Sequence, residues 1–432
     1  MIYLGLLLFF VLDYIRPTSY IPALLPLHLN SIVPIAVAGA ALFRDRPVSM
    51  HELLADTNTK LVGAWFALLL ISMLTADVTL YAYTAVMSVL GYVLMFVAIQ
   101  KLATDIRRLK GVFATLVVVH LAVAVLNPQI FGSGERQYLA SGFFLGDGND
   151  FALSVNIALA LCVFLLFDAR ARAKPVWLVA LVVLVGSVIV TQSRGGTLAL
   201  GAVGAFFWMR MDRKALVAGL ALATVVGVLL LAPSSYFDRM NTISTQEGSA
   251  QGRILAWKAS MWMALDNPVF GVGAGNFATT YGSRYLSSPD LPQATAHSIY
   301  FLTLGELGLP GFVLLVGAIV WNFSANRRLT AEISGRDPTR WAREIRLLAS
   351  TSAALLAFAV GGAFLSAIYY PHFYVLAGLL AAARRVVRTH VLQTPDAGAP
   401  PMARKNDLSI HWALRPAASV RTLKSASAVA RR

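Results

Sequence analysis

The stretch FALSVNIALALCVFLLF, at 151–167, is followed after a short basic turn by VWLVALVVLVGSVIVT, at 176–191. Each block approaches the roughly 20 apolar residues with which a helix crosses the hydrocarbon core of a bilayer. Lipid offers the backbone no hydrogen-bond partners, so a segment that crosses it must be helical. This stretch therefore predicts two spanning helices joined by DARARAKP, at 168–175.

The same apolar character extends over most of the 432 residues, of which 57% are hydrophobic and 13% charged. Soluble domains carry about 25% charged residues, so this composition excludes a soluble fold. We predict an all-α polytopic membrane protein with about twelve transmembrane helices. The predicted spans lie near 1–14, 27–43, 61–76, 79–99, 111–126, 151–167, 176–191, 196–209, 215–232, 298–322, 347–368 and 372–388.

The basic residues predict the orientation of these helices. With the N-terminus in the cytoplasm, the inside segments and the tail from 384 hold 29 of the 36 Lys and Arg residues. This is the bias of cytoplasmic loops toward positive charge, and it predicts that both termini are cytoplasmic. The tail at 389–432 is rich in Ala, Pro, Ser and Arg, and we expect it to be disordered beside anionic lipid. We expect membrane lipids, and no nucleic acid, as its partner.

Four parts follow from this topology: spans 1–9 in 1–232, an outside loop at 233–297, spans 10–12 in 298–388, and the tail. Loops longer than about 15 residues are uncommon unless they are functional or disordered, and this loop is rich in aromatic residues. Its segment RILAWKASMWMAL, at 253–265, has helical spacing of apolar residues. Asn267 and Pro268 end that helix, and GVGAGNF, at 271–277, predicts a tight glycine turn.

Few cations lie on the outside, and Arg194 is the most informative of them. It stands in TQSRGGT, between two spans with almost no connection, where its planar guanidinium suits phosphate oxygens. The alternative is a salt bridge at a helix end. Arg253 opens the predicted loop helix, either as a second anion ligand or as a solvated charge. Arg136, Arg239 and Arg284 are weaker candidates by the same reasoning.

His297 and Glu306 lie where the long loop enters the tenth span. A neutral imidazole can take a proton from a hydroxyl nucleophile, although a capping or interfacial histidine is the alternative. Glu306 is about 13 Å further along the helix and on its opposite face, so it should not contact His297 unless the helix breaks. It is either a supporting functional carboxylate or a structural hydrogen-bond partner of a neighbouring helix.

The sequence contains no HExxH, CxxC pair or P-loop, and GDGND at 146–150 lacks the ligand pattern of a calcium loop. We therefore expect no metal and no cofactor. Instead, we expect Asp150 to cap the sixth span.

Four motifs together resemble the O-antigen ligase family of bacterial inner-membrane proteins. They are NDFALSVN at 149–156, SRGG at 193–196, GRILAWKASMWMALDNPVFGVGAGNF at 252–277 and AHSIYFLTLGELGLPG at 296–311. The resemblance implies a metal-independent glycosyl transfer on the periplasmic face, so the loop at 233–297 would be periplasmic. The donor would be a glycan on undecaprenyl diphosphate. Arg194 and Arg253 would bind the diphosphate, and His297 would activate the acceptor hydroxyl.

The resemblance leaves the acceptor open. A ligase transfers the glycan to lipid A–core or a similar acceptor, and a polymerase of the same family transfers it to another lipid-linked repeat unit. We favour the ligase on the character of the long outer loop. A lipid-glycan transporter or flippase is the alternative from another class. It would need polar residues along a path open to both sides, whereas the candidate residues here lie at one face.

Overall fold

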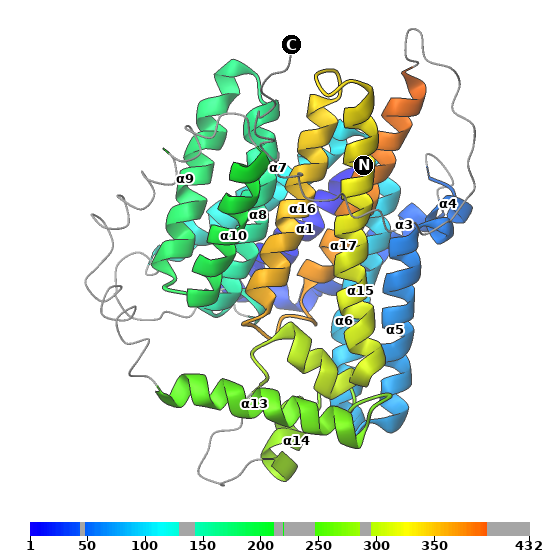
Figure 1. Ribbon diagram of the computed structural model, residues 1–432, viewed down its shortest axis with the longest axis vertical. Helices are drawn as coiled ribbons and strands as arrows, with labels where there is room; N and C mark the ends of the chain where they lie inside the picture. The colour runs from blue at the N-terminus through cyan, green and yellow to red at the C-terminus, as the bar shows by residue number, and fades with distance from the viewer. Residues whose placement is uncertain (44–47, 129–142, 211–218, 220–246, 286–294, 395–432) are drawn as a thin grey trace, which may run out of the picture. The chain divides into compact units, whose positions relative to one another are not determined.

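The computed structural model describes residues 1–43, 48–128, 143–210, 219, 247–285 and 295–394, and within these ranges every regular element is a helix (Figure 1). The fold is therefore all-α, as predicted. Residues Met1–Leu392 form one compact unit, and Gln393 begins a second. The first helices are α1 (Ile2–Ile15), α2 (Pro17–Tyr20), α3 (Leu29–Leu42), α4 (Met50–Ala55), α5 (Thr57–Thr75), α6 (Thr79–Leu102) and α7 (Ile106–Leu126). The others are α8 (Gly148–Asp168), α9 (Lys174–Val190), α10 (Arg194–Arg210), α13 (Glu247–Asp266), α14 (Phe277–Thr280), α15 (Ile299–Arg336), α16 (Ala342–Gly362) and α17 (Pro371–Gln393).

Eight helical segments in the described part of the chain are long and apolar enough to cross a membrane. They are Pro22–Leu42, Thr57–Thr75, Thr79–Leu102, Ile106–Leu126, Gly148–Asp168, Ala171–Val190, Ile299–Arg336 and Ala342–Gly362. The predicted spans at 1–14, 196–209 and 372–388 coincide with α1, α10 and α17. Apart from residue 219, the predicted span at 215–232 lies outside the described residues, and so does the tail from 395. The number twelve and the sidedness stay predictions.

Helix α8 is the most deeply buried of the eight apolar segments. Most of its residues are buried, and it packs against α7, α9, α10 and α16. A helix that is apolar all round belongs in such an interior. Toward α10, the amide of Asn156 donates to the carbonyl of Gly196 at 3.0 Å. This hydrogen bond fixes the start of α10 against α8.

The capping of α8 differs from the prediction. The helix begins at Gly148, and its N-cap is Asp147, whose carboxylate accepts from the backbone N–H of Asn149 at 3.1 Å. Asp150 lies inside the first turn, so the prediction that Asp150 caps this helix is wrong. The apolar run begins only at Phe151, and for that reason it suggested too late a start.

Helix α15 is longer than the predicted 298–322 and contains a break. Gly308 has φ 63° and ψ −163°, a conformation outside the helical region that glycine adopts without steric cost, and Pro310 follows two residues later. The carbonyl of Pro268, from the loop, accepts the N–H of Leu309 at 2.9 Å. The break thus allows the backbone of α15 to form a hydrogen bond with the segment that follows α13.

The loop helix was predicted well. Helix α13 contains the predicted 253–265 and ends at Asp266, immediately before Asn267 and Pro268. In Figure 1 it runs crosswise to the long helices α5 and α15. It packs on α15 through its buried residues Ala256, Ala259, Ser260 and Met263.

Candidate functional site

Arg194 is the first residue of α10. Ser193 caps the helix, because its hydroxyl accepts the N–H of Gly196 at 3.0 Å. The residue before it, Gln192, is buried and has φ 52°, in the left-handed region. A helix N-terminus carries partial positive charge, and the half-buried guanidinium of Arg194 adds a full one. This end of α10 therefore favours an anion.

The two glycines after Arg194 are packing positions. A Cβ at Gly195 would lie 3.0 Å from the Cβ of Phe364, and one at Gly196 would lie 2.6 Å from the Cβ of Ala152. Phe364 belongs to the connection at 363–370, between α16 and α17. The glycines thus bring the start of α10 against this connection on one side and against α8 on the other.

His297 lies two residues before the start of α15, half-buried, with φ 47°. The left-handed region is uncommon for residues other than glycine, and such conformations concentrate at functional sites. The 363–370 connection also contacts the segment that carries His297. The hydroxyls of Thr295 and Ser366 are hydrogen-bonded at 2.7 Å. Just beyond the histidine, a Cβ at Gly362 would lie 2.7 Å from Cδ1 of Ile299.

Trp257 connects α13 to the segment that precedes α15. Its indole N–H donates to the carbonyl of Ala296 at 2.9 Å, and its ring stacks on Phe301 with centroids 4.9 Å apart. Arg253 is one turn earlier on α13, half-buried and on the side of the helix that carries Trp257. The tryptophan therefore connects the helix of Arg253 to the residue next to His297.

These contacts bring the three main candidates to one end of the bundle. The start of α10 touches the 363–370 connection at Phe364, and the segment before α15 touches it at Ser366. Helix α13 contacts that segment through Trp257. Arg194, Arg253 and His297 therefore belong to three segments that meet at one connection, although they are far apart in the sequence.

Glu306 holds the neighbouring backbone in place and is not grouped with Arg194, Arg253 and His297. One carboxylate oxygen accepts the N–H of Phe277 at 2.9 Å, and the other accepts the hydroxyl of Tyr369, from the 363–370 connection. The backbone N–H groups of Val272 and Gly273 also donate to the carbonyls of Gly305 and Glu306, at 3.0 and 2.9 Å. The carboxylate is 2% exposed and fixes the glycine turn and the connection to α15.

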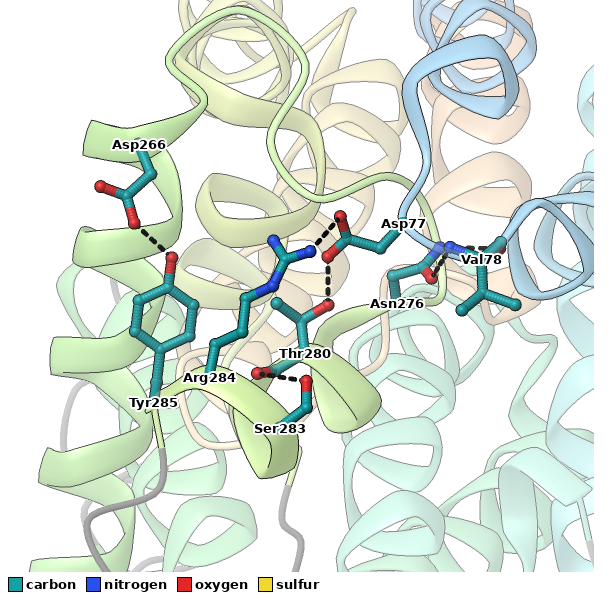
Figure 2. Close-up of polar contacts among 8 residues, drawn as sticks. All are labelled: Asp77, Val78, Asp266, Asn276, Thr280, Ser283, Arg284 and Tyr285. Carbon is teal, nitrogen blue, oxygen red and sulfur yellow. Dashed lines mark hydrogen bonds and ion pairs between the residues drawn. The ribbon is translucent and has the colours of Figure 1, made fainter.

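The glycine turn is as predicted, and its backbone explains its composition. Gly271, Gly273 and Gly275 all have positive φ, at 59°, 91° and 72°. A Cβ at Gly271 would lie 2.3 Å from the carbonyl oxygen of Gly305, so the turn and the broken helix touch backbone to backbone. Asn276 ties the turn to the α5–α6 connection, because its side chain accepts the N–H of Val78 at 2.8 Å (Figure 2).

Arg284 has a partner elsewhere. It forms an ion pair with Asp77 at 3.2 Å, and Asp77 also accepts the hydroxyl of Thr280 at 2.7 Å (Figure 2). Next to it, the Tyr285 hydroxyl donates to Asp266 at 2.5 Å. Burial, and then the hydrogen bond to Asp266, raise the pKa of Tyr285 to about 12. Asp266 is thirteen positions from Arg253, about 20 Å along α13.

The predicted site residues therefore differ in their positions and partners. It brings the segments of Arg194, Arg253 and His297 together, gives Glu306 a supporting position and pairs Arg284 with a carboxylate. Arg136 and Arg239 lie outside the described residues. Sequence reasoning missed Tyr369, Ser366 and the hydrogen bond of Trp257. The tryptophan is visible in the motif, but nothing in the sequence shows that Ala296 is its partner.

The fold is that of a helical membrane protein in which the segments of two arginines and a histidine meet at one connection. Residues 179–316 match the family model described as O-Antigen ligase. This match, over about a third of the chain, confirms the resemblance of the sequence to the O-antigen ligase family and supports glycosyl transfer in general. It includes Arg194, Arg253 and His297. No curated protein matches the chain.

Proposed function

We propose that this protein transfers a glycan from undecaprenyl diphosphate to an acceptor hydroxyl, on the periplasmic side of a bacterial inner membrane. The observation that carries the proposal is the meeting of three segments at the 363–370 connection. These segments hold Arg194, Arg253 and His297, and all three residues fall within the matched region. Membrane lipids surround the protein, and the donor reaches it from the bilayer.

The two arginines would hold the diphosphate. When the glycosidic bond breaks, its electron pair leaves with the diphosphate oxygen and negative charge grows there. Guanidinium groups fixed in place before the reaction stabilise that charge without reorganisation. The N-terminus of α10 acts in the same direction. An anionic leaving group of this kind departs without a general acid.

His297 would act on the acceptor. Its neutral imidazole takes the proton of the acceptor hydroxyl as the oxygen attacks the anomeric carbon, a role that contributes about 10²–10⁴-fold in rate. One C–O bond forms, the C–O bond to the diphosphate breaks, and the anomeric configuration inverts. The reaction needs no cofactor and no nucleotide sugar.

The acceptor is tested with purified protein, a lipid-linked glycan and each acceptor in turn. Transfer to lipid A–core or a similar terminal acceptor is the result that we expect of a ligase. Chains of growing length with no such transfer would make the protein a polymerase of the same family. Movement of labelled lipid across liposomes, without transfer and unaffected by His297→Ala, would replace the proposal with a flippase.

A further inference from the structure

Helix α13 has an exposed apolar face that no described part of the protein covers. Six large apolar residues on α13 and just after it are 38–69% exposed: Ile254, Leu255, Met261, Trp262, Leu265 and Val269. The five on the helix recur at the spacing of one helical face, and exposed Lys258 lies in the middle of it. We call the five and Val269 the α13 apolar stripe. The buried residues of α13 and the side of Arg253 and Trp257 lie on the rest of its circumference.

The stripe continues into the surface of a spanning helix. Val269, at its end, is 53% exposed, and its neighbour Pro268 accepts the N–H of Leu309 at the break in α15. Leu309 and Val313 of α15 are 57% and 58% exposed, on a helix long and apolar enough to cross the membrane. Such residues face lipid. The stripe is therefore continuous with a lipid-facing surface.

Helix α13 is not among the helices that are apolar enough to cross the membrane, and Arg253 and Lys258 lie among its apolar residues. It runs crosswise to α15 (Figure 1). A crosswise helix with an exposed apolar face and a basic residue has the character of helices that lie in the membrane interface. Tryptophan concentrates at this depth, and a lysine within an apolar face can extend its stem toward lipid phosphate.

We propose that α13 lies in the outer headgroup region of the bilayer, with the α13 apolar stripe in contact with acyl chains. The side chain of Lys258 reaches toward lipid phosphates. Arg253 and Trp257, on another side of the helix, are then held at the depth of the phosphate groups. This last consequence rests on the proposed function, because it places Arg253 where the diphosphate of a membrane-anchored donor lies.

Site-directed spin labelling tests the location without any measurement of transfer. Cys162 is the only cysteine of the chain and is buried, so Cys162→Ser provides a background for single labels. In that background, Leu265→Cys reports on the stripe. Ser283→Cys is the matched control, because it is exposed in the same loop and outside the stripe. Each labelled protein is reconstituted in nanodiscs of phosphatidylethanolamine and phosphatidylglycerol.

At Leu265→Cys we expect the label to collide more with oxygen, which concentrates in lipid, than with a water-soluble nickel complex. At Ser283→Cys we expect the reverse. Equal access of the nickel complex at both positions would place the stripe in water and overturn the proposal. Exclusion of both reagents from Leu265→Cys would show that protein, such as a second copy, covers the stripe, and would also overturn it. Because transfer is not measured, a failure here leaves the proposed function standing.

Discussion

Replacement of Glu306 by alanine tests how the glycine turn and the 363–370 connection are held. The carboxylate is the shared acceptor of the Phe277 N–H and the Tyr369 hydroxyl, and it is 2% exposed. Its removal leaves two buried donors without this acceptor. An unsatisfied buried donor costs about 1–3 kcal/mol, so we expect Glu306→Ala to lower the free energy of unfolding by about 2–6 kcal/mol.

Graded variants separate the two hydrogen bonds. Glu306→Gln keeps an oxygen for Phe277 and an amide beside Tyr369, and should cost only about 0.5–1.5 kcal/mol. Tyr369→Phe removes one donor and leaves the other bond intact. Because the two residues share one bond, the cost of Glu306→Ala combined with Tyr369→Phe should be less than the sum of the single costs.

The assay is thermal unfolding of the detergent-solubilised protein, followed by tryptophan fluorescence, with transfer activity measured in parallel. Glu332→Ala is the matched control, because Glu332 is an exposed carboxylate of the same helix that forms an ion pair with Arg336 at 3.9 Å. Exposed pairs contribute about 0–1 kcal/mol, so this variant should melt close to the wild type. If Glu306→Ala melts together with Glu332→Ala, the carboxylate does not hold the turn and the reasoning fails.

Three further substitutions probe the site. Arg194→Ala should abolish transfer while the protein still inserts into the membrane. Arg194→Lys should also transfer poorly, because lysine lacks the bidentate fork of arginine. Normal turnover of the lysine variant would contradict this. Trp257→Phe keeps the stacking on Phe301 but loses the hydrogen bond to Ala296, so transfer should fall with unchanged membrane insertion, measured by fractionation. Arg284→Ala should leave transfer near the wild-type rate, because this arginine pairs with Asp77; a loss as large as that of Arg194→Ala would return it to the site.

The positions of the helices could be predicted because the signals are local. Apolar runs gave most of the spans, and Asn267 with Pro268 gave the end of α13. The glycines at 271–275 gave a turn whose positive φ angles only glycine adopts easily. The start of α8 was misplaced, because Asp147, four residues before the apolar run, caps it.

The contacts that assemble the site could not be predicted in this way. Tyr369 reaches Glu306 across 63 positions, and Trp257 reaches Ala296 across 39. The break in α15 depends on Gly308, which the sequence shows only as one glycine among several suited to close helix packing. Arg253 and Arg284 looked alike as loop arginines, and the structure distinguishes them by the contact of Trp257 with Ala296 beside Arg253 and by the ion pair of Arg284 with Asp77.

Binding of undecaprenyl diphosphate to the purified protein in nanodiscs, compared with transfer by the same preparations, tests the proposed division of roles most directly. A hydrogen bond to a charged group contributes about 1.5–3 kcal/mol, so Arg194→Ala and Arg253→Ala should each weaken binding about tenfold to a hundredfold. His297→Ala should bind as the wild type does and transfer nothing. Wild-type binding by both arginine variants, or near-normal transfer by His297→Ala, would contradict the account.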